Sequence, residues 1–215
     1  GPLLLSPAYS IPDENIGYLS RYAPGKRENG GVYTHAATWA IWAFSLLRKD
    51  DLVYEIFKRL SPIYNGSNPD KYVAEPYVTP GNIDGPESPN YGMAGWSWYT
   101  GSASWFQKVI VDWLLGIRAT KDGLCIDPCI PKDWKEFSVK RKYRGCIYHI
   151  KVFNQENVSH GVKYIKIGNT KLEGNIIKPE NSKEISVEVY LGKLEKNLNL
   201  KSPSNEKEIN QIIYK

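Results

Sequence analysis

Two short stretches of the sequence combine residue types that could bind an anion. His35 lies in the first turn expected for one helix, and Thr100-Gly101 opens another. A helix N-terminus carries free backbone N–H groups and the positive end of the helix dipole, so it attracts anions. Gly101 would let a ligand approach the backbone, while the Thr100 hydroxyl and the His35 imidazole could donate hydrogen bonds. These residues indicate a phosphate site, although each also fits a purely structural role as cap, turn or core residue.

Charged residues near these helix starts could contact a sugar. Arg27 and Glu28 stand beside a glycine pair, shortly before the helix that carries His35. Glu75 occurs within residues 61–95, a segment rich in Pro, Gly and Asn; a loop of that length is often functional. Acid–base cleavage of a glycosidic bond needs one or two carboxylates flanking the bond. The sequence alone does not choose among the loop carboxylates, which also fit the role of solvated surface charges.

Other catalytic and metal-binding signatures are missing from the sequence. It contains no GxSxG, HExxH or P-loop motif. Two of its three histidines, His149 and His160, fall in a region expected to form strands. Cys125 and Cys129 lack the spacing of a zinc site and are interpreted as small buried residues. We therefore expect no metal and no cofactor.

The hydrophobic periodicity predicts helices in the first part of the chain. Residues 36–47 are apolar nearly all round, which is typical of a helix buried on every side, with Thr34 as its cap. Residues 52–60 form a one-sided stripe, so an inner and an outer helix of a barrel or bundle follow one another. A further stripe over residues 105–117 follows Thr100, the natural N-cap of a third helix.

In the second part the period changes to two. Apolar and polar residues alternate after Gly123, for example over residues 185–191, which predicts an antiparallel β unit. We therefore expect an α+β protein with a helical domain over residues 1–122 and a β domain over 123–193. Residues 194–215 are expected to be a polar tail or a short final helix.

Composition narrows the class of protein. The chain has 215 residues, a formal net charge of +5 and a hydrophobic share of 41%, so it can form a core. No nucleic-acid motif accompanies the basic residues, so an exposed strand face explains them better than nucleic-acid binding. The N-terminal "GPLLLSPAYS" predicts neither a signal peptide nor a membrane span. An odd count of three cysteines favours a reducing compartment, and we expect a cytoplasmic protein.

Four segments, "RYAPGKRENGGVYTHAATWA", "KYVAEPYV", "GWSWYTGSASW" and "LLGIRATKDGLCIDPCIPKDW", resemble the C-terminal part of the cellobiose phosphorylase-like family, glycoside hydrolase family 94. The resemblance runs from about residue 3 to about residue 193. It implies the last helices of an (α/α)6 barrel followed by an antiparallel β-sandwich domain. It also implies inverting phosphorolysis, in which inorganic phosphate attacks the anomeric carbon of a β-linked gluco-oligosaccharide and α-glucose 1-phosphate leaves.

The resemblance also implies site residues. In the family, a His and a Thr-Gly pair hold the phosphate, and they fall here on His35, Thr100 and Gly101. The family segments that line the sugar subsites match this chain at Arg27, Glu28 and Glu75. The loop around Gly81 is closer to members acting on cellobionic acid or β-1,2-linked glucans, because cellobiose and chitobiose enzymes tend to carry Gln there.

The general acid of the family is an Asp in a motif upstream of the matched stretch, and nothing in this sequence matches it. Because a well-placed acid contributes about 10²–10⁴-fold, we expect negligible activity from the chain alone. The alternatives are a non-catalytic carbohydrate-binding or assembly module, and the phosphorylase-like domain of a cyclic β-1,2-glucan synthase. The apolar faces of helices from an incomplete barrel would be exposed, so we expect them to bind a partner. That partner is either the missing N-terminal part of the same enzyme or another copy of this chain.

Overall fold

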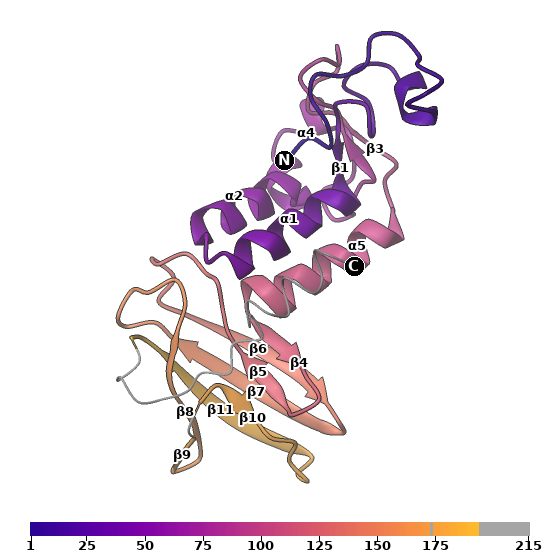
Figure 1. Ribbon diagram of the computed structural model, residues 1–215. Helices are drawn as coiled ribbons and strands as arrows, with labels where there is room; N and C mark the ends of the chain where they lie inside the picture. Colours follow the sequence, from indigo (N-terminus) through magenta and orange to yellow (C-terminus); the bar gives the residue numbers. More distant parts are fainter. Residues whose placement is uncertain (173, 194–215) are drawn as a thin grey trace. The chain divides into compact units, whose positions relative to one another are not determined.

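A computed structural model describes residues 1–172 and 174–193 (Figure 1). It mixes helices and strands, which confirms the α+β class. By compactness the described chain divides into two units: Gly1–Ser45 with Asp51–Ile110, and Leu46–Asp50 with the described residues that follow Ile110. The short loop between two helices of the first unit therefore belongs to the second unit.

The chain changes unit between Ile110 and Val111. The domain boundary expected at residue 122 stays a prediction. The polar tail or final helix expected over residues 194–215 lies outside the described residues. Within the described ranges no helix is both long and apolar enough to cross a membrane.

The first unit holds helices and a small antiparallel sheet of order β1-β2-β3. Its elements are η1 (Tyr18–Arg21), β1 (Val32–Tyr33), α1 (Thr34–Leu46), α2 (Asp50–Leu60), α3 (Pro62–Asn65), α4 (Pro69–Tyr72), β2 (Asn82–Ile83), β3 (Ala94–Gly95) and α5 (Thr100–Val109). β1 immediately precedes α1, and β2 and β3 lie between α1 and α5 in the sequence. The sheet therefore brings together the starts of the two helices that carry the predicted phosphate residues.

Helix α1 is buried on one face only. Ala37 and Ile41 are buried, whereas the Trp39 side chain is 49% exposed and Ala43 is exposed as well. The prediction of a helix buried on every side is therefore wrong for the described chain, because its neighbours cover only one face of α1. An apolar face is left open, as expected for a helix that needs a further partner.

Helix α5 begins at Thr100 itself, so the prediction that Thr100 is the N-cap is wrong. The N-cap is Tyr99, whose backbone is extended and whose side chain makes no capping hydrogen bond. The helix passes into a π-helical turn, η2 (Ile110–Leu114), and ends before Gly116, which has φ +69°. The apolar stripe expected to be one helix over residues 105–117 thus runs into a strand, because left-handed backbone at a glycine ends the helix.

The second unit contains two sheets, of order β10-β5-β4 and β6-β7-β11-β8-β9. Its strands are β4 (Ile117–Ala119), β5 (Leu124–Ile126), β6 (Glu136–Tyr143), β7 (Cys146–Phe153), β8 (Val162–Ile167), β9 (Thr170–Leu172), β10 (Ile176–Ile177) and β11 (Glu184–Leu191). Both sheets contribute to one hydrophobic core, for example Ile126 from one sheet and Ile150 and Val189 from the other. Cys125, Cys129 and Cys146 are buried free thiols, as expected.

The larger sheet is mixed. β11 pairs in parallel with β7, Val187 opposite Ile150, and antiparallel with β8 on its other side. The prediction of a purely antiparallel unit is therefore wrong for one strand pair. Alternation of apolar and polar residues identifies which side chains face the core but carries no information on strand direction.

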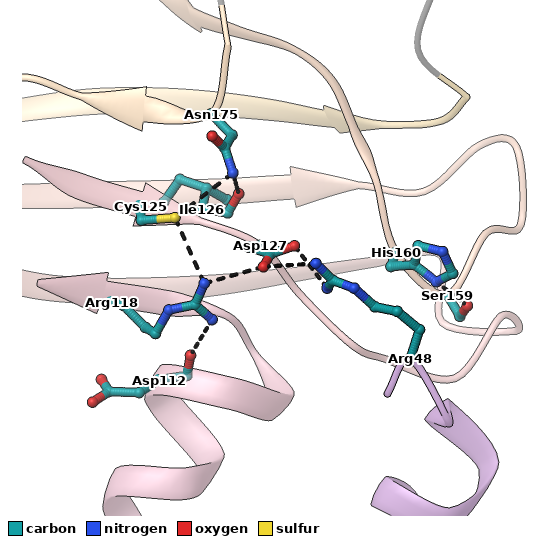
Figure 2. Close-up of polar contacts among 9 residues, drawn as sticks. All are labelled: Arg48, Asp112, Arg118, Cys125, Ile126, Asp127, Ser159, His160 and Asn175. Carbon is teal, nitrogen blue, oxygen red and sulfur yellow. Dashed lines mark hydrogen bonds and ion pairs between the residues drawn. The ribbon is translucent and has the colours of Figure 1, made fainter. Parts of the chain in front are cut away.

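An ion-pair network holds the loop of residues 46–50 within the second unit (Figure 2). Asp127 accepts hydrogen bonds from both terminal nitrogens of Arg48, at 2.8 and 3.0 Å, and from Nη2 of Arg118 at 3.0 Å. Burial by itself raises the pKa of Asp127, but the two arginines outweigh it and hold that pKa below its ordinary value. Asp127 is thus a fully paired, ionised anchor.

Candidate functional site

The imidazole of His35 is enclosed by aromatic rings from three parts of the first unit. Its ring lies 6.5 Å from that of Tyr33 on β1, 5.4 Å from Trp39 on α1 and 6.0 Å from Trp105 on α5. Such contacts between ring centroids fix the orientation of a side chain as well as its position. His35 is therefore pre-oriented by packing.

The structure brings His35 to the start of α5. A Cβ built on Gly101 would lie 3.8 Å from His35 Nδ1 and would meet no other described atom within 4 Å outside its own helix. Thr100 and Gly101 are exposed, and the N–H groups of a first helical turn have no acceptor within the helix. An imidazole nitrogen and the free backbone N–H groups of the first turn of α5 thus lie at one accessible place, beside the exposed residue Thr100.

Several buried polar atoms in this part of the first unit have no hydrogen-bond partner among the described residues. Near the two helix starts they are Thr34 Oγ1, His35 Nε2 and Ser102 Oγ. Near the glycine pair they are Asn82 Oδ1 and two atoms that form only an ion pair with each other, Arg27 Nε and Glu28 Oε2. Buried polar groups are almost always paired in folded proteins, so such a concentration points to a site that binds polar groups.

Arg27 sits at the tip of a tight turn. Its φ is +50°, and the turn is closed by hydrogen bonds from Gly25 N to Asn29 O and from Asn29 N to Lys26 O. The amide of Asn29, which is fully buried, donates to the carbonyls of Tyr9 and Tyr22 and fixes the turn against the N-terminal segment. The residues around Arg27 therefore define its direction before any ligand binds.

The Arg27 guanidinium is sandwiched between two rings. Its carbon lies 3.3 Å from the ring centroid of Trp96 and 4.3 Å from that of Tyr22. Nε of Arg27 and Oε2 of Glu28 approach to 3.5 Å. Because both faces of the guanidinium are covered, its in-plane N–H groups are the ones left to bind a ligand. A pocket of about 210 Å³ opens beside it, lined by Lys26, Arg27, Asn82, Asp84, Met93, Ala94, Gly95 and Trp96.

Glu75 is attached to the loop that precedes α5. The indole N–H of Trp98 donates to Glu75 Oε1 at 3.0 Å. The backbone N–H of Glu75 itself, followed by the Trp98 indole, holds the pKa of Glu75 below its ordinary value. An ionised carboxylate of this kind suits hydrogen bonding to hydroxyl groups rather than donation of a proton.

Backbone hydrogen bonds around Gly81 join the parts of the site. Thr34 N donates to Gly81 O at 3.0 Å, and Tyr99 N donates to Thr79 O at 3.1 Å. Gly81 N donates to the carbonyl of Trp96 at 2.9 Å. A Cβ on Gly81 would approach the Trp96 ring to 3.1 Å, which is tighter than ordinary packing. The absence of a side chain at residue 81 therefore leaves room for the Trp96 ring.

Sequence reasoning missed Tyr33 and the role of one carboxylate. Trp96 covers Arg27, and the hydroxyls of Tyr33 and Tyr99 meet at 3.1 Å. Asp84 is buried and accepts from Asn82, Ser88 and Lys26, so it anchors the pocket wall. Aromatic residues directly before two candidate helix starts were the available signal for the tyrosines. Within residues 1–172 and 174–193 no group of three or more His, Cys, Asp and Glu could hold a metal ion.

Comparisons with known proteins match two consecutive parts of the chain to two family models. Residues 1–116 match the family model for the glycosyl hydrolase 94 superfamily, catalytic domain. Residues 117–164 match that for the glycosyl hydrolase family 65, C-terminal domain. The two matches meet close to the start of β4.

Curated relatives of this chain are mostly much longer glycoside phosphorylases. An N,N'-diacetylchitobiose phosphorylase of Vibrio proteolyticus is 34% identical over 88% of this chain, which covers 24% of that relative. A solabiose phosphorylase of Paenibacillus borealis is 32% identical, over 82% of this chain and 23% of the relative. A cyclic beta-(1,2)-glucan synthase of Rhizobium meliloti is 38% identical, over 69% of this chain and 5% of the relative. The chain thus spans about a quarter of the length of the phosphorylases it matches. It belongs to the glycosyl hydrolase 94 superfamily.

Proposed function

We propose that this chain is part of an inverting glycoside phosphorylase and supplies its phosphate site. The observation that carries the proposal is the approach of His35 Nδ1 to Gly101 at the open start of α5. In this reading the anion accepts hydrogen bonds from the His35 imidazole, the Thr100 hydroxyl and the first backbone N–H groups of α5. The helix dipole adds attraction for the negative charge.

In the proposed reaction an oxygen of inorganic phosphate attacks the anomeric carbon of a β-glucoside. The new bond joins that carbon to the phosphate oxygen, and the bond to the leaving sugar oxygen breaks. A proton passes to the leaving oxygen from a general acid outside this chain. Donors aimed at the phosphate hold it in line for attack, which is the positioning contribution expected of this segment. The products are α-glucose 1-phosphate and the released sugar.

The sugar is assigned to the pocket beside Arg27. The in-plane N–H groups of Arg27 suit hydroxyl groups, and the Trp96 ring provides an apolar wall. Glu28, which contacts Arg27, and Glu75, which is bonded to Trp98, do not line this pocket and are proposed to bind sugar hydroxyls outside it. The finer architecture follows from the same proposal: the first unit is the last part of an (α/α)6 barrel, and the two sheets of the second unit form a β-sandwich. The relatives named above are named for different sugars, N,N'-diacetylchitobiose, solabiose and cyclic β-1,2-glucan, so the proposal extends only to a β-linked gluco-oligosaccharide.

Release of glucose 1-phosphate tests the proposal. The complete enzyme that contains this chain is expected to release it from a β-linked gluco-oligosaccharide only when phosphate is present. The isolated 215-residue chain is expected to release almost none, because loss of a general acid alone costs about 10²–10⁴-fold. Activity of the isolated chain near that of the complete enzyme would contradict the proposal, as would phosphate-independent hydrolysis by the complete enzyme.

A second function is favoured by one observation, the 38% identity to a cyclic beta-(1,2)-glucan synthase. In that case the same site would act on β-1,2-linked chains within a larger polymer-forming protein. A glycosyltransferase region in the complete protein, with phosphorolysis restricted to β-1,2-linked glucans, would decide for it. A non-catalytic binding module is the remaining alternative, and a complete protein that binds the glucan without phosphorolysis would decide for that.

A further inference from the structure

Two tyrosine hydroxyls meet between the two halves of the proposed phosphate site. Tyr33 Oη and Tyr99 Oη are 3.1 Å apart, and either can be the donor. Tyr33 lies two residues before His35, and Tyr99 immediately precedes Thr100. The side-chain bond therefore joins the two chain segments next to the residues that are assigned to the phosphate.

We propose that the Tyr33–Tyr99 hydroxyl pair is a positioning element that sets the separation between His35 and the start of α5. This role rests on the proposed function. Both tyrosines act through their neighbours and are not assigned a contact with phosphate.

The packing around the pair explains how one hydrogen bond can fix the site. The Tyr33 ring stacks on His35, with 30° between the ring planes, and the Tyr99 ring stacks on Trp96 with 24°. The Trp96 ring in turn covers the Arg27 guanidinium. A continuous row of rings thus connects the sugar-side residue Arg27 with the phosphate-side residue His35, and the hydroxyl pair is its central link.

No described backbone hydrogen bond joins the segment of Tyr33 directly to the segment of Tyr99, so a side-chain bond can set the distance between them. The segments that carry Tyr33 and Tyr99 are each bonded to residues 79–81 but not, among the described hydrogen bonds, to each other's backbone. Tyr99 is the N-cap residue of α5 without a side-chain capping bond, so its side chain is available for another role. The hydrogen bond with Tyr99, followed by burial, raises the pKa of Tyr33 to about 12, so the Tyr33 hydroxyl keeps its proton at neutral pH.

The chain offers a matched control. Tyr54 Oη and Tyr64 Oη are 3.2 Å apart elsewhere in the first unit, on residues outside the proposed site. Tyr64→Phe therefore deletes the same kind of hydrogen bond without touching the row of rings. The Tyr54–Tyr64 bond is exposed whereas the Tyr33–Tyr99 bond is partly buried, so this variant controls for the effect of losing a phenol hydrogen bond on the kinetics rather than on stability.

The experiment measures the KM for phosphate and for the sugar in the complete enzyme, for Tyr33→Phe, Tyr99→Phe, the double variant and Tyr64→Phe. Each single substitution at the pair is expected to raise the phosphate KM by about threefold to tenfold, the effect of one lost neutral hydrogen bond. The double variant is expected to be no worse than the singles, because all three delete the same bond. The sugar KM should follow the Tyr64→Phe control.

Three outcomes overturn the proposal: a wild-type phosphate KM in Tyr99→Phe, an equal rise in both KM values, or additive effects in the double variant. If the wild-type enzyme shows no phosphate-dependent release of glucose 1-phosphate, the proposed function fails and the positioning role fails with it. If the wild type is phosphate-dependent and the tyrosine variants match it, only the positioning role fails.

Discussion

The Nδ1 atom of His35 and the position of a Cβ on Gly101 lie 3.8 Å apart, an ordinary van der Waals distance. A methyl group at residue 101 therefore fits the protein but occupies the space in which an anion would contact the backbone. A side chain at residue 101 is therefore compatible with folding but not with anion binding. A substitution at this residue can separate the effect on stability from the effect on phosphate binding.

Gly101→Ala is expected to leave the free energy of unfolding unchanged or raise it by up to about 1 kcal/mol, since alanine favours helix more than glycine. The same change should raise the phosphate KM of the complete enzyme by at least about tenfold, because the blocked approach removes a charge-assisted hydrogen bond. Chemical denaturation and phosphate kinetics check the two halves. Normal phosphate kinetics in this variant would show that the anion does not bind against the backbone at Gly101.

Thr100→Val removes a hydroxyl with little change in volume. A charge-assisted hydrogen bond contributes about 1.5–3 kcal/mol, so the phosphate KM should rise by about tenfold to 100-fold while the sugar KM changes little. Thr100→Ser keeps the hydroxyl and serves as the control. Because Thr100 is exposed and is not the cap of α5, no large loss of stability should accompany the change.

Trp96→Ala tests the sugar side of the site. It uncovers one face of the Arg27 guanidinium, and a cation–π contact of this kind contributes about 0.5–2 kcal/mol. The sugar KM should therefore rise by about twofold to 30-fold with a smaller change in the phosphate KM. A double-mutant cycle with Arg27→Met measures whether the two side chains act together. Independent, additive effects would show that the stacking seen in the structure does not hold Arg27 for the sugar.

The acid stability of the second unit should depend on Asp127. Its pKa is lower in the folded protein than in the unfolded chain, so it contributes stability that is present above the unfolded pKa, about 3.9. That contribution disappears as the pH falls through the lower, folded pKa. Asp127→Asn should therefore flatten the acid side of the stability profile, measured by denaturation at a series of pH values.

Arg48→Met breaks the bidentate half of the same network and should destabilise the protein by about 1–3 kcal/mol, since a largely buried carboxylate loses a charged partner. Arg59→Met is the control, because its pairing with Glu55 is exposed and such pairs contribute about 0–1 kcal/mol. Equal effects of the two substitutions would show that Asp127 is satisfied by Arg118 alone.

The local signals in the sequence were sufficient to propose the phosphate-site candidates but not the hydrogen bond between the residues beside them. His35, Thr100 and Gly101 stand out because helix starts can be recognised from a few neighbouring residues. The Tyr33–Tyr99 bond joins residues 66 positions apart, and no local pattern encodes such a pairing. The positive φ of Trp96, +53°, likewise contradicts the usual preference of a bulky residue and follows from tertiary contacts.

The fold was predictable to a similar degree. The alternation over residues 185–191 identified a strand and its buried face, but its parallel pairing with β7 depends on the path of the chain between them. Helix α1 was expected to be buried all round because its residues are apolar. Burial also requires neighbouring segments, which a local pattern does not supply.

The assignment of residues 46–50 to the second unit also affects how proteins of this kind can be recombined. The chain passes from the helical unit to the other unit, returns, and crosses again after Ile110. A chimaera made by joining two relatives at a single point near residue 110 would therefore pair the loop of one parent with the Asp127 of the other. To exchange the second unit between relatives, two separate segments would have to be replaced together: the loop of residues 46–50 and the chain after Ile110. Arg48 and its hydrogen-bond acceptor Asp127 would then come from the same parent.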